Sequence, residues 1–127
     1  MDSLYRDYIL DHYKNPRNFG TLDPHDLEAH DHNPLCGDEL GVHLVVGEDG
    51  TIADLRFHGQ GCAISQASAS IASEELIGMR VDAVDDLGAD WVFELLGIDI
   101  SPTRRKCALL SLKVVRGAAT GDASWPE

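Results

Sequence analysis

The sequence predicts an α+β domain in which one small sheet lies between helical segments. Apolar residues recur at helical spacing near the N-terminus, strand-like runs fill residues 27–58, and helix-forming residues dominate from residue 63 onward. A chain of 127 residues, 43% of them hydrophobic, suits one globular domain with one core. We expect a single domain over residues 1–127, with flexible ends at 1–3 and 118–127.

The first predicted element is a helix from Leu4 to Lys14. Leu4, Tyr8 and His12 lie on one stripe of such a helix, and Tyr5, Ile9 and Tyr13 lie on the next. Asn15-Pro16 ends it, because the residue before a proline is driven out of the helical region. Three tyrosines exceed what one buried face needs, so part of this helix is predicted to be a docking surface.

The strands come next along the chain. Gly47-Glu48-Asp49-Gly50 is a hairpin signal, and polar and apolar residues roughly alternate in the run that follows it. The alternation predicts a sheet with one face exposed to water. The predicted strands are Leu27–His32, Leu40–Val46 and Thr51–His58.

The remainder of the chain is predicted to be helical. Gly78 ends the first of these helices, and Ser101 and Pro102 open the last one as N-cap and first-turn proline. The predicted helices are Ala63–Ile77, Val81–Leu87, Ala89–Leu96 and a final helix that runs from Ser101 to about Gly117.

Charge and hydropathy exclude several functions. A formal net charge of −12 would repel nucleic-acid phosphates, so we expect no nucleic-acid partner. No apolar run is long enough to span a bilayer, and residues 1–5 lack the basic and apolar stretches of a signal peptide. We therefore expect a cytoplasmic protein with no membrane partner. Arg104-Arg105-Lys106 is the exception to the acidic balance, and it directly precedes Cys107.

The three cysteines, Cys36, Cys62 and Cys107, are too few and too widely spaced for a disulfide framework. In a reducing compartment such thiols are core residues, metal ligands or nucleophiles. Gly37 permits a bend that lets Cys36 and Asp38 point to one spot. Cys62 follows Gly59-Gln60-Gly61 at a predicted helix N-terminus, which favours a thiolate.

Cys107 lies in the opening part of the last predicted helix. Cations near a helix N-terminus interact unfavourably with the helix dipole, so three basic residues at positions 104–106 are unusual there. Departures from local preference of this kind occur often at functional sites. The cluster is predicted to lower the pKa of Cys107 and to attract an anionic partner. The alternative is a basic face that merely offsets an acidic protein.

Cys36, Asp38, Cys62 and Cys107 together form a donor set of three sulfurs and one oxygen. This set suits Zn²⁺ or the irons of a forming iron–sulfur cluster. Five histidines remain alternative ligands, and the stretch from Pro24 to His32 is a histidine-rich tract of the kind that binds metals adventitiously. They are His25, His30, His32, His43 and His58.

Several motifs in the same order resemble the NifU-like N-terminal domain of IscU and SufU proteins, over about residues 4–115. The motifs are Tyr5, Asp11-His12-Tyr13-Lys14-Asn15-Pro16-Arg17-Asn18, Asn33-Pro34-Leu35-Cys36-Gly37-Asp38, Gly59-Gln60-Gly61-Cys62-Ala63-Ile64-Ser65 and Ser101-Pro102-Thr103-Arg104-Arg105-Lys106-Cys107-Ala108.

This resemblance implies iron–sulfur cluster assembly on a three-stranded antiparallel sheet packed against helices. It implies that Cys36, Asp38, Cys62 and Cys107 hold Zn²⁺, iron or a transient [2Fe–2S] cluster. It also implies a cysteine desulfurase as partner, with cluster carriers or apo iron–sulfur proteins downstream. Cys36 matches the sulfur acceptor of SufU-like proteins, and Cys107 matches the acceptor of IscU-like scaffolds.

Two departures from IscU favour the SufU type. Lys106 replaces the histidine that precedes the third cysteine of IscU, and residues 99–103 do not match the chaperone-binding Leu-Pro-Pro-Val-Lys loop. The short segment between Gly78 and Gly97, however, leaves little room for the insertion typical of SufU. The sequence thus leaves open three functions: a zinc-bound sulfur acceptor, which would be a sulfurtransferase supported by Arg104; a cluster scaffold; or a structural zinc adaptor.

Overall fold

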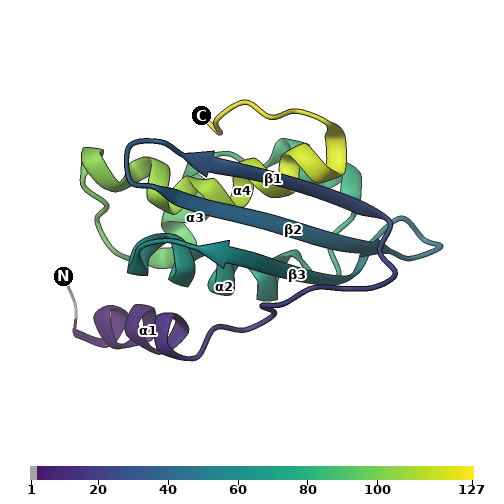
Figure 1. The fold of residues 1–127 in the computed structure, drawn as a ribbon. Coiled ribbons are helices and arrows are strands. Elements are labelled where there is room, and N and C mark those ends of the chain that lie inside the picture. The colour runs from purple at the N-terminus through teal and green to yellow at the C-terminus, as the bar shows by residue number, and fades with distance from the viewer. Residues whose placement is uncertain (1–2) are drawn as a thin grey trace.

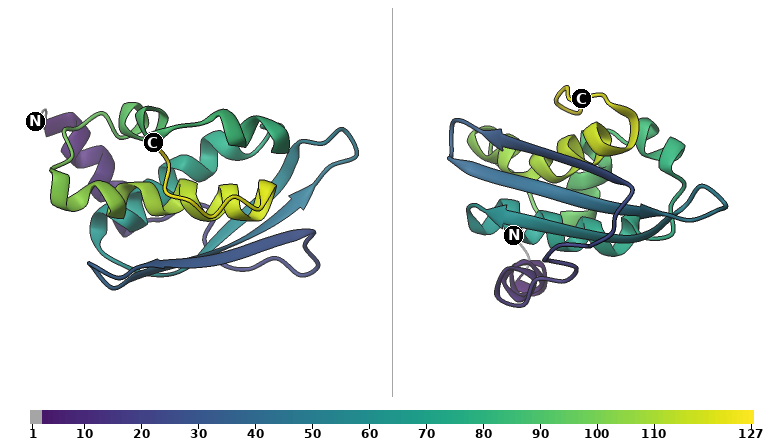
Figure 2. Two further views of the ribbon diagram at one scale, coloured as in Figure 1. Left: turned by 90° about the horizontal axis from the view of Figure 1, so that it is seen from above. Right: turned by 45° about the vertical axis from the view of Figure 1, so that its right-hand side comes forward.

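The computed structural model describes residues 3–127, with side chains from Arg6 onward. It confirms the α+β class with a three-stranded antiparallel sheet in the order β1-β2-β3. Helices α2, α3 and α4 lie on one face of this sheet, and α1 packs beside α2 (Figures 1 and 2). The elements are α1 (Ser3–Lys14), β1 (Leu27–Asn33), β2 (Asp38–Val46), β3 (Ile52–Gln60), α2 (Ala63–Leu76), η1 (Val81–Asp86), α3 (Ala89–Leu96), η2 (Pro102–Arg104) and α4 (Arg105–Thr120).

The two faces of the sheet differ as the alternation predicts. Leu40, Val42 and Leu44 of β2 point toward the helices and are fully buried, as are Leu55 and Phe57 of β3. The residues between them point to the other, open face, which carries most of the histidines. Because β1 pairs Asn33 with Asp38, both of these polar side chains lie on the helix side, at one end of the sheet.

Small residues let α2 and α4 pack closely against each other. Ala67, Ala69 and Ala72 are buried on α2, and the Ser68 hydroxyl donates a 2.7 Å hydrogen bond to the Ala108 carbonyl of α4. A buried hydroxyl that has a partner avoids the desolvation penalty of an unpaired one. This contact fixes the start of α4, and with it Cys107, against the helix that begins next to Cys62.

Two segments expected to be α-helical are wound more tightly. Residues 81–86 form the 3₁₀ helix η1, and the last helix opens with the 3₁₀ turn η2 before α4 begins at Arg105. In η2 the Arg104 amide donates to the Ser101 carbonyl at 2.9 Å. The Ser101 side chain makes no capping bond and pairs with the Thr103 hydroxyl instead. Single 3₁₀ turns are common at helix ends.

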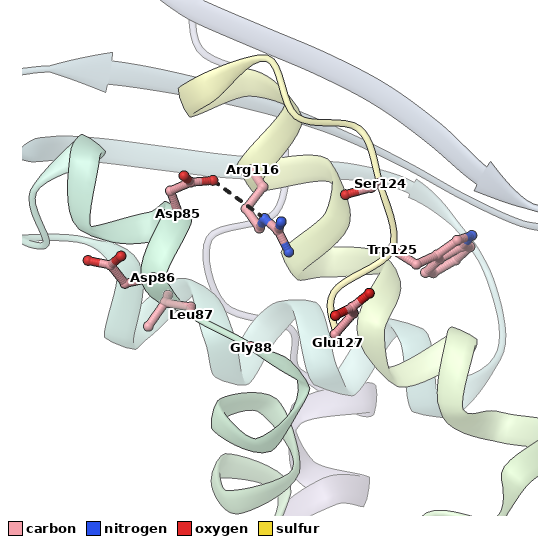
Figure 3. Close-up of a pocket in the computed structure, with 8 residues that line it drawn as sticks. All are labelled: Asp85, Asp86, Leu87, Gly88, Arg116, Ser124, Trp125 and Glu127. Atoms are coloured by element: carbon pink, nitrogen blue, oxygen red, sulfur yellow. Dashed lines mark ion pairs between the residues drawn. The ribbon is translucent and has the colours of Figure 1, made fainter.

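The C-terminal segment contacts the body of the molecule. Helix α4 continues to Thr120, and the ammonium groups of Lys106 and Lys113 each lie 5.2 Å from the centre of the Trp125 ring. The Ala89 amide donates to the Glu127 carbonyl at 2.9 Å. Figure 3 shows Arg116, Trp125 and Glu127 among the residues that line a pocket of about 270 Å³, with the Trp125 ring directed away from Arg116.

Helix α1 contacts α2 through a polar seam centred on His12. His12 is 3% exposed, and its Nδ1 lies 2.7 Å from the Ser70 hydroxyl. Burial, followed by the positive charge of Arg17, lowers the pKa of His12, and Glu74 opposes this shift. The Tyr5 side chain is outside the described part, while Tyr8 and Tyr13 are 40% and 44% exposed, which agrees with a partly exposed aromatic face.

We expect acid to destabilise the protein partly through His12. The folded state takes up a proton less readily than the unfolded chain, so stability falls as pH drops below the ordinary value of 6.5. Urea unfolding at about pH 7.5 and about pH 5.5 should show a larger acid-induced loss for wild type than for His12→Gln, by about 1 kcal/mol or less. Equal losses in the two proteins would show that His12 contributes nothing.

Candidate thiol and carboxylate site

Asn33 organises the turn that carries Cys36. Its backbone carbonyl accepts the Gly37 amide at 2.9 Å, and its side-chain oxygen accepts the Leu35 amide at 3.2 Å. Gly37 has φ +73°, a conformation that glycine adopts at little cost. The turn connects β1 to β2 and leaves the Cys36 thiol exposed beside Leu35, which is 77% exposed.

Asp38 is a buried carboxylate with one free oxygen. It begins β2, is 1% exposed, and its Oδ1 accepts the Cys62 amide at 2.8 Å. This bond caps α2, whose N-cap residue Cys62 makes no side-chain cap of its own. Oδ2 is buried and has no hydrogen-bond partner among the described residues. A buried carboxylate oxygen left in this way is costly unless a cation approaches it.

Gly61 fits tightly against this carboxylate. A Cβ on Gly61 would lie 2.3 Å from the Ser65 hydroxyl and 2.8 Å from Asp38 Oδ1. Ser65 can rotate away, but Asp38 cannot move without losing the Cys62 amide. The absence of a side chain at residue 61 therefore keeps Asp38 in place.

We expect Gly61→Ala to disturb the site more than the fold. The crowding should destabilise the protein by about 1–3 kcal/mol, and displacement of Asp38 should weaken metal binding by about 10–100-fold. Zinc titration with a competing chelator, alongside urea unfolding, measures both effects. Unchanged zinc affinity in a folded Gly61→Ala protein would show that the position of Asp38 does not matter for the metal.

Cys107 meets Cys36 at the start of α4. The two Sγ atoms are 3.1 Å apart, and the Asn33 side-chain amide donates to Cys107 Sγ at 3.8 Å. Candidate ligand atoms of Cys36, Asp38 and Cys107 all lie within 4.8 Å of one another. Cys62 is not part of that triplet, but it lines an open pocket of about 590 Å³ together with Cys36 and Arg104.

The prediction that basic neighbours lower the pKa of Cys107 is wrong. Burial raises the pKa of this thiol, and the contact with Cys36 raises it further. Cys107 is completely buried, so the loss of hydration outweighs any nearby cation. The free thiol of Cys107 is therefore a weaker acid than an ordinary cysteine, and Cys36 is the exposed thiol of the pair.

The three basic residues before Cys107 point in different directions. The thiolate charge of Cys62, then a hydrogen bond to it, raises the pKa of Arg104, which therefore lies at the sulfurs. The Arg105 guanidinium lies 4.6 Å from the centre of the Phe93 ring, and Lys106 lies over Trp125. The structure shows no ion pair between Arg104 and Asp38.

Sequence reasoning gave no separate role to Asn33 or Gly61. Asn33 was visible only as part of the motif around Cys36, and its hydrogen bond to Cys107 joins residues 74 positions apart. Gly61 belongs to the motif that precedes Cys62, and its fit against Asp38 likewise depends on tertiary contacts. None of the five histidines joins the group of Cys36, Asp38 and Cys107. Two of them, His25 and His43, form a separate group with Glu28.

Fold and site define a small α+β protein that brings three thiols and a carboxylate together at one end of its sheet. Residues 4–121 match the model of the NifU-like N-terminal domain. The chain therefore belongs to the family of NifU-like N-terminal domains, which includes the SufU and IscU proteins of iron–sulfur cluster assembly. This confirms the resemblance seen in the sequence.

Named relatives agree with this family. The chain is 35% identical to the zinc-dependent sulfurtransferase SufU of Bacillus subtilis, with 91% of this chain and 88% of SufU aligned. It is 32% identical to the scaffold protein IscU of Azotobacter vinelandii, with 90% of each aligned. A solved structure of a proposed SUF-system scaffold protein from Fervidobacterium islandicum superposes with a TM-score of 0.79 at 25% identity, covering 90% of this chain and 95% of the other.

Iron–sulfur cluster assembly is thus the process in which this chain takes part. Proteins of this family in general work with cysteine desulfurases and pass clusters on. No helix in the described part of the chain is both long and apolar enough to cross a membrane.

Proposed function

We propose that this chain is a zinc-bound sulfur acceptor, which receives sulfur at Cys36 from the persulfide of a cysteine desulfurase in the cytoplasm. The observation that carries this proposal is the pairing of an exposed thiol, Cys36, with a buried one, Cys107, at 3.1 Å, beside the free oxygen of Asp38. The similarity to a protein named as a zinc-dependent sulfurtransferase supports it.

The residues present fit a zinc ion. Asp38 Oδ2 is buried without a partner, so a cation there would remove a desolvation penalty, and the sulfurs of Cys36 and Cys107 are near enough to share an ion. We assign Cys36, Asp38, Cys62 and Cys107 as its ligands, a set that suits Zn²⁺. A bound Zn²⁺ would hold the cysteines as thiolates without redox chemistry of its own.

Sulfur transfer needs an accessible thiolate. The Cys36 thiolate attacks the outer sulfur of the desulfurase persulfide, forming a new S–S bond at Cys36. The sulfur–sulfur bond in the desulfurase breaks, and the desulfurase cysteine leaves as a thiolate. Cys107 is less suited to this attack because it is buried and its pKa is raised. Arg104, which lies at the sulfurs, supplies positive charge at the mouth of the site.

Labelled sulfur tests the proposal directly. Zinc-loaded protein is incubated with a cysteine desulfurase and ³⁵S-labelled cysteine, then separated and treated with a thiol reductant. We expect about one labelled sulfur per chain, released by the reductant, together with faster desulfurase turnover. No label on the chain and unchanged turnover would contradict the proposal and would favour a structural zinc adaptor.

A scaffold role is the second candidate, because the same donor set accepts iron and several relatives are named scaffolds. Here a [2Fe–2S] cluster is the cargo, built on the three cysteines and passed to cluster carriers or apo-proteins. Anaerobic reconstitution with iron and sulfide should then give a visible cluster that can be transferred. Retained zinc and no cluster spectrum would count against this role.

A further inference from the structure

The open face of the sheet and the loop before β1 carry five of the six histidines of the chain. His30 and His32 alternate along β1, and His43 and His58 lie on β2 and β3. His25, in the loop that precedes β1, stacks on His43 with ring centroids 3.7 Å apart and the planes at 11°. Only the group of His25, Glu28 and His43, among these, brings its candidate ligand atoms within 4.8 Å of one another.

His25 is oriented as metal-binding histidines usually are. Its Nδ1 lies 2.7 Å from the Leu22 carbonyl, which can only accept, so Nδ1 carries the proton. The other nitrogen, Nε2, faces Glu28 Oε1 at 3.2 Å. In a neutral ring this places a lone pair against the carboxylate, so the contact is favourable when either a metal ion or a proton lies between them. The hydrogen bonds to the Leu22 carbonyl and to Glu28 raise the pKa of His25, and a metal ion would compete with that proton for Nε2. When two donor atoms bind one ion with bonds of about 2.0–2.2 Å, the donor atoms lie about 3.0–3.4 Å from each other, which is the range of the Nε2–Oε1 distance.

His43 supplies a second imidazole at the same place. It is held behind His25 by the stacking and by the Leu22 amide, which donates to His43 Nδ1 at 3.1 Å. His58 packs edge-on against the His43 ring, with centroids 4.8 Å apart. The two stacked rings are nearly parallel, so their nitrogens cannot both point at one ion. To share an ion with His25, the His43 side chain must rotate away from the His25 ring and lose its hydrogen bond from the Leu22 amide.

We propose that His25, Glu28 and His43 form a second cation site, distinct from the thiol site and specific for a divalent first-row transition metal. Two imidazoles and one carboxylate with open positions are the donor set of non-haem Fe²⁺ sites and also of catalytic Zn²⁺ sites, and Fe²⁺ serves as the probe because it is paramagnetic. His43 lies five residues beyond Asp38 along β2, which places the two sites about 16 Å apart. One ion therefore cannot serve both sites.

Fe²⁺ titration of protein whose thiol site is already filled with one equivalent of Zn²⁺ tests this site. Under anaerobic conditions calorimetry should detect one further ion, and paramagnetic Fe²⁺ should broaden the imidazole resonances of His25 and His43. We expect Glu28→Gln and His25→Gln each to weaken this binding at least about tenfold. His32→Gln, which removes an exposed histidine of the same face outside the group, should leave it unchanged.

Three outcomes would overturn the proposal. They are the absence of a second ion in wild type, equal Fe²⁺ affinity of Glu28→Gln and wild type, and a loss in His32→Gln as large as in the ligand variants. Glu28 is exposed, so its substitution leaves the fold intact even if His25→Gln does not. Sulfur transfer to Cys36 does not depend on this site, so failure here leaves the proposed function standing.

Discussion

A Cys36→Ala protein is expected to accept no sulfur from the desulfurase persulfide. Cys36 is the exposed thiol of the site, on a turn that the side chain of Asn33 holds in place, and alanine offers no nucleophile there. Loss of a nucleophile lowers activity by several orders of magnitude, so we expect at least about a 1,000-fold slower transfer in single-turnover assays with labelled persulfide.

Cys107→Ala is the matched variant for this experiment, because it removes a thiol from the same site and leaves the exposed one. It should weaken zinc binding but retain sulfur acceptance at Cys36, since burial keeps Cys107 from attacking. The reverse pattern, with transfer lost in Cys107→Ala and kept in Cys36→Ala, would assign the acceptor role to Cys107. That result would contradict the proposal and agree with the IscU-like alternative.

Asp38→Asn is expected to cost most of the zinc affinity while the protein remains folded. The amide oxygen of asparagine can still accept the Cys62 amide in place of Oδ1, so the cap of α2 survives. The group that replaces the unpartnered Oδ2 is a neutral NH₂, which is not a metal ligand. Loss of outer-shell partners already costs 10–100-fold in affinity, so loss of a direct ligand should cost at least about 100-fold.

Glu39→Gln provides the control for Asp38→Asn. Glu39 is the next residue of β2, carries the same charge, and points to the opposite face of the sheet. Chelator competition should show unchanged zinc affinity for Glu39→Gln, and thermal unfolding should show that both variants are folded. Similar zinc affinities for Asp38→Asn and wild type would remove Asp38 from the site.

Local signals were sufficient to predict the elements of the fold. These signals act over a few residues, so the expected helices and strands appear near their predicted bounds. They are the proline after Asn15, the hairpin glycines at residues 47 and 50, and the glycines before Cys62. The position of Cys62 at the start of α2 was predicted for the same reason. Chemical type and motif order together indicate four residues as candidates to share one ion.

Tertiary packing determined what the sequence could not show. Charge near Cys107 suggested a lowered pKa, yet its complete burial between α4 and the turn at Asn33 raises the pKa. The basic cluster looked like one patch, but the rings of Phe93 and Trp125 attract two of its three members away from the sulfurs. Trp125 likewise packs against the core and lies over Lys113.

The most direct test of the account is zinc X-ray absorption spectroscopy on protein purified without oxygen and carrying one equivalent of metal. We expect a first shell of three sulfurs at about 2.3 Å and one oxygen at about 2.0–2.2 Å. A shell with two or fewer sulfurs, or one dominated by imidazole nitrogen, would show that residues 36, 38, 62 and 107 do not hold one ion together.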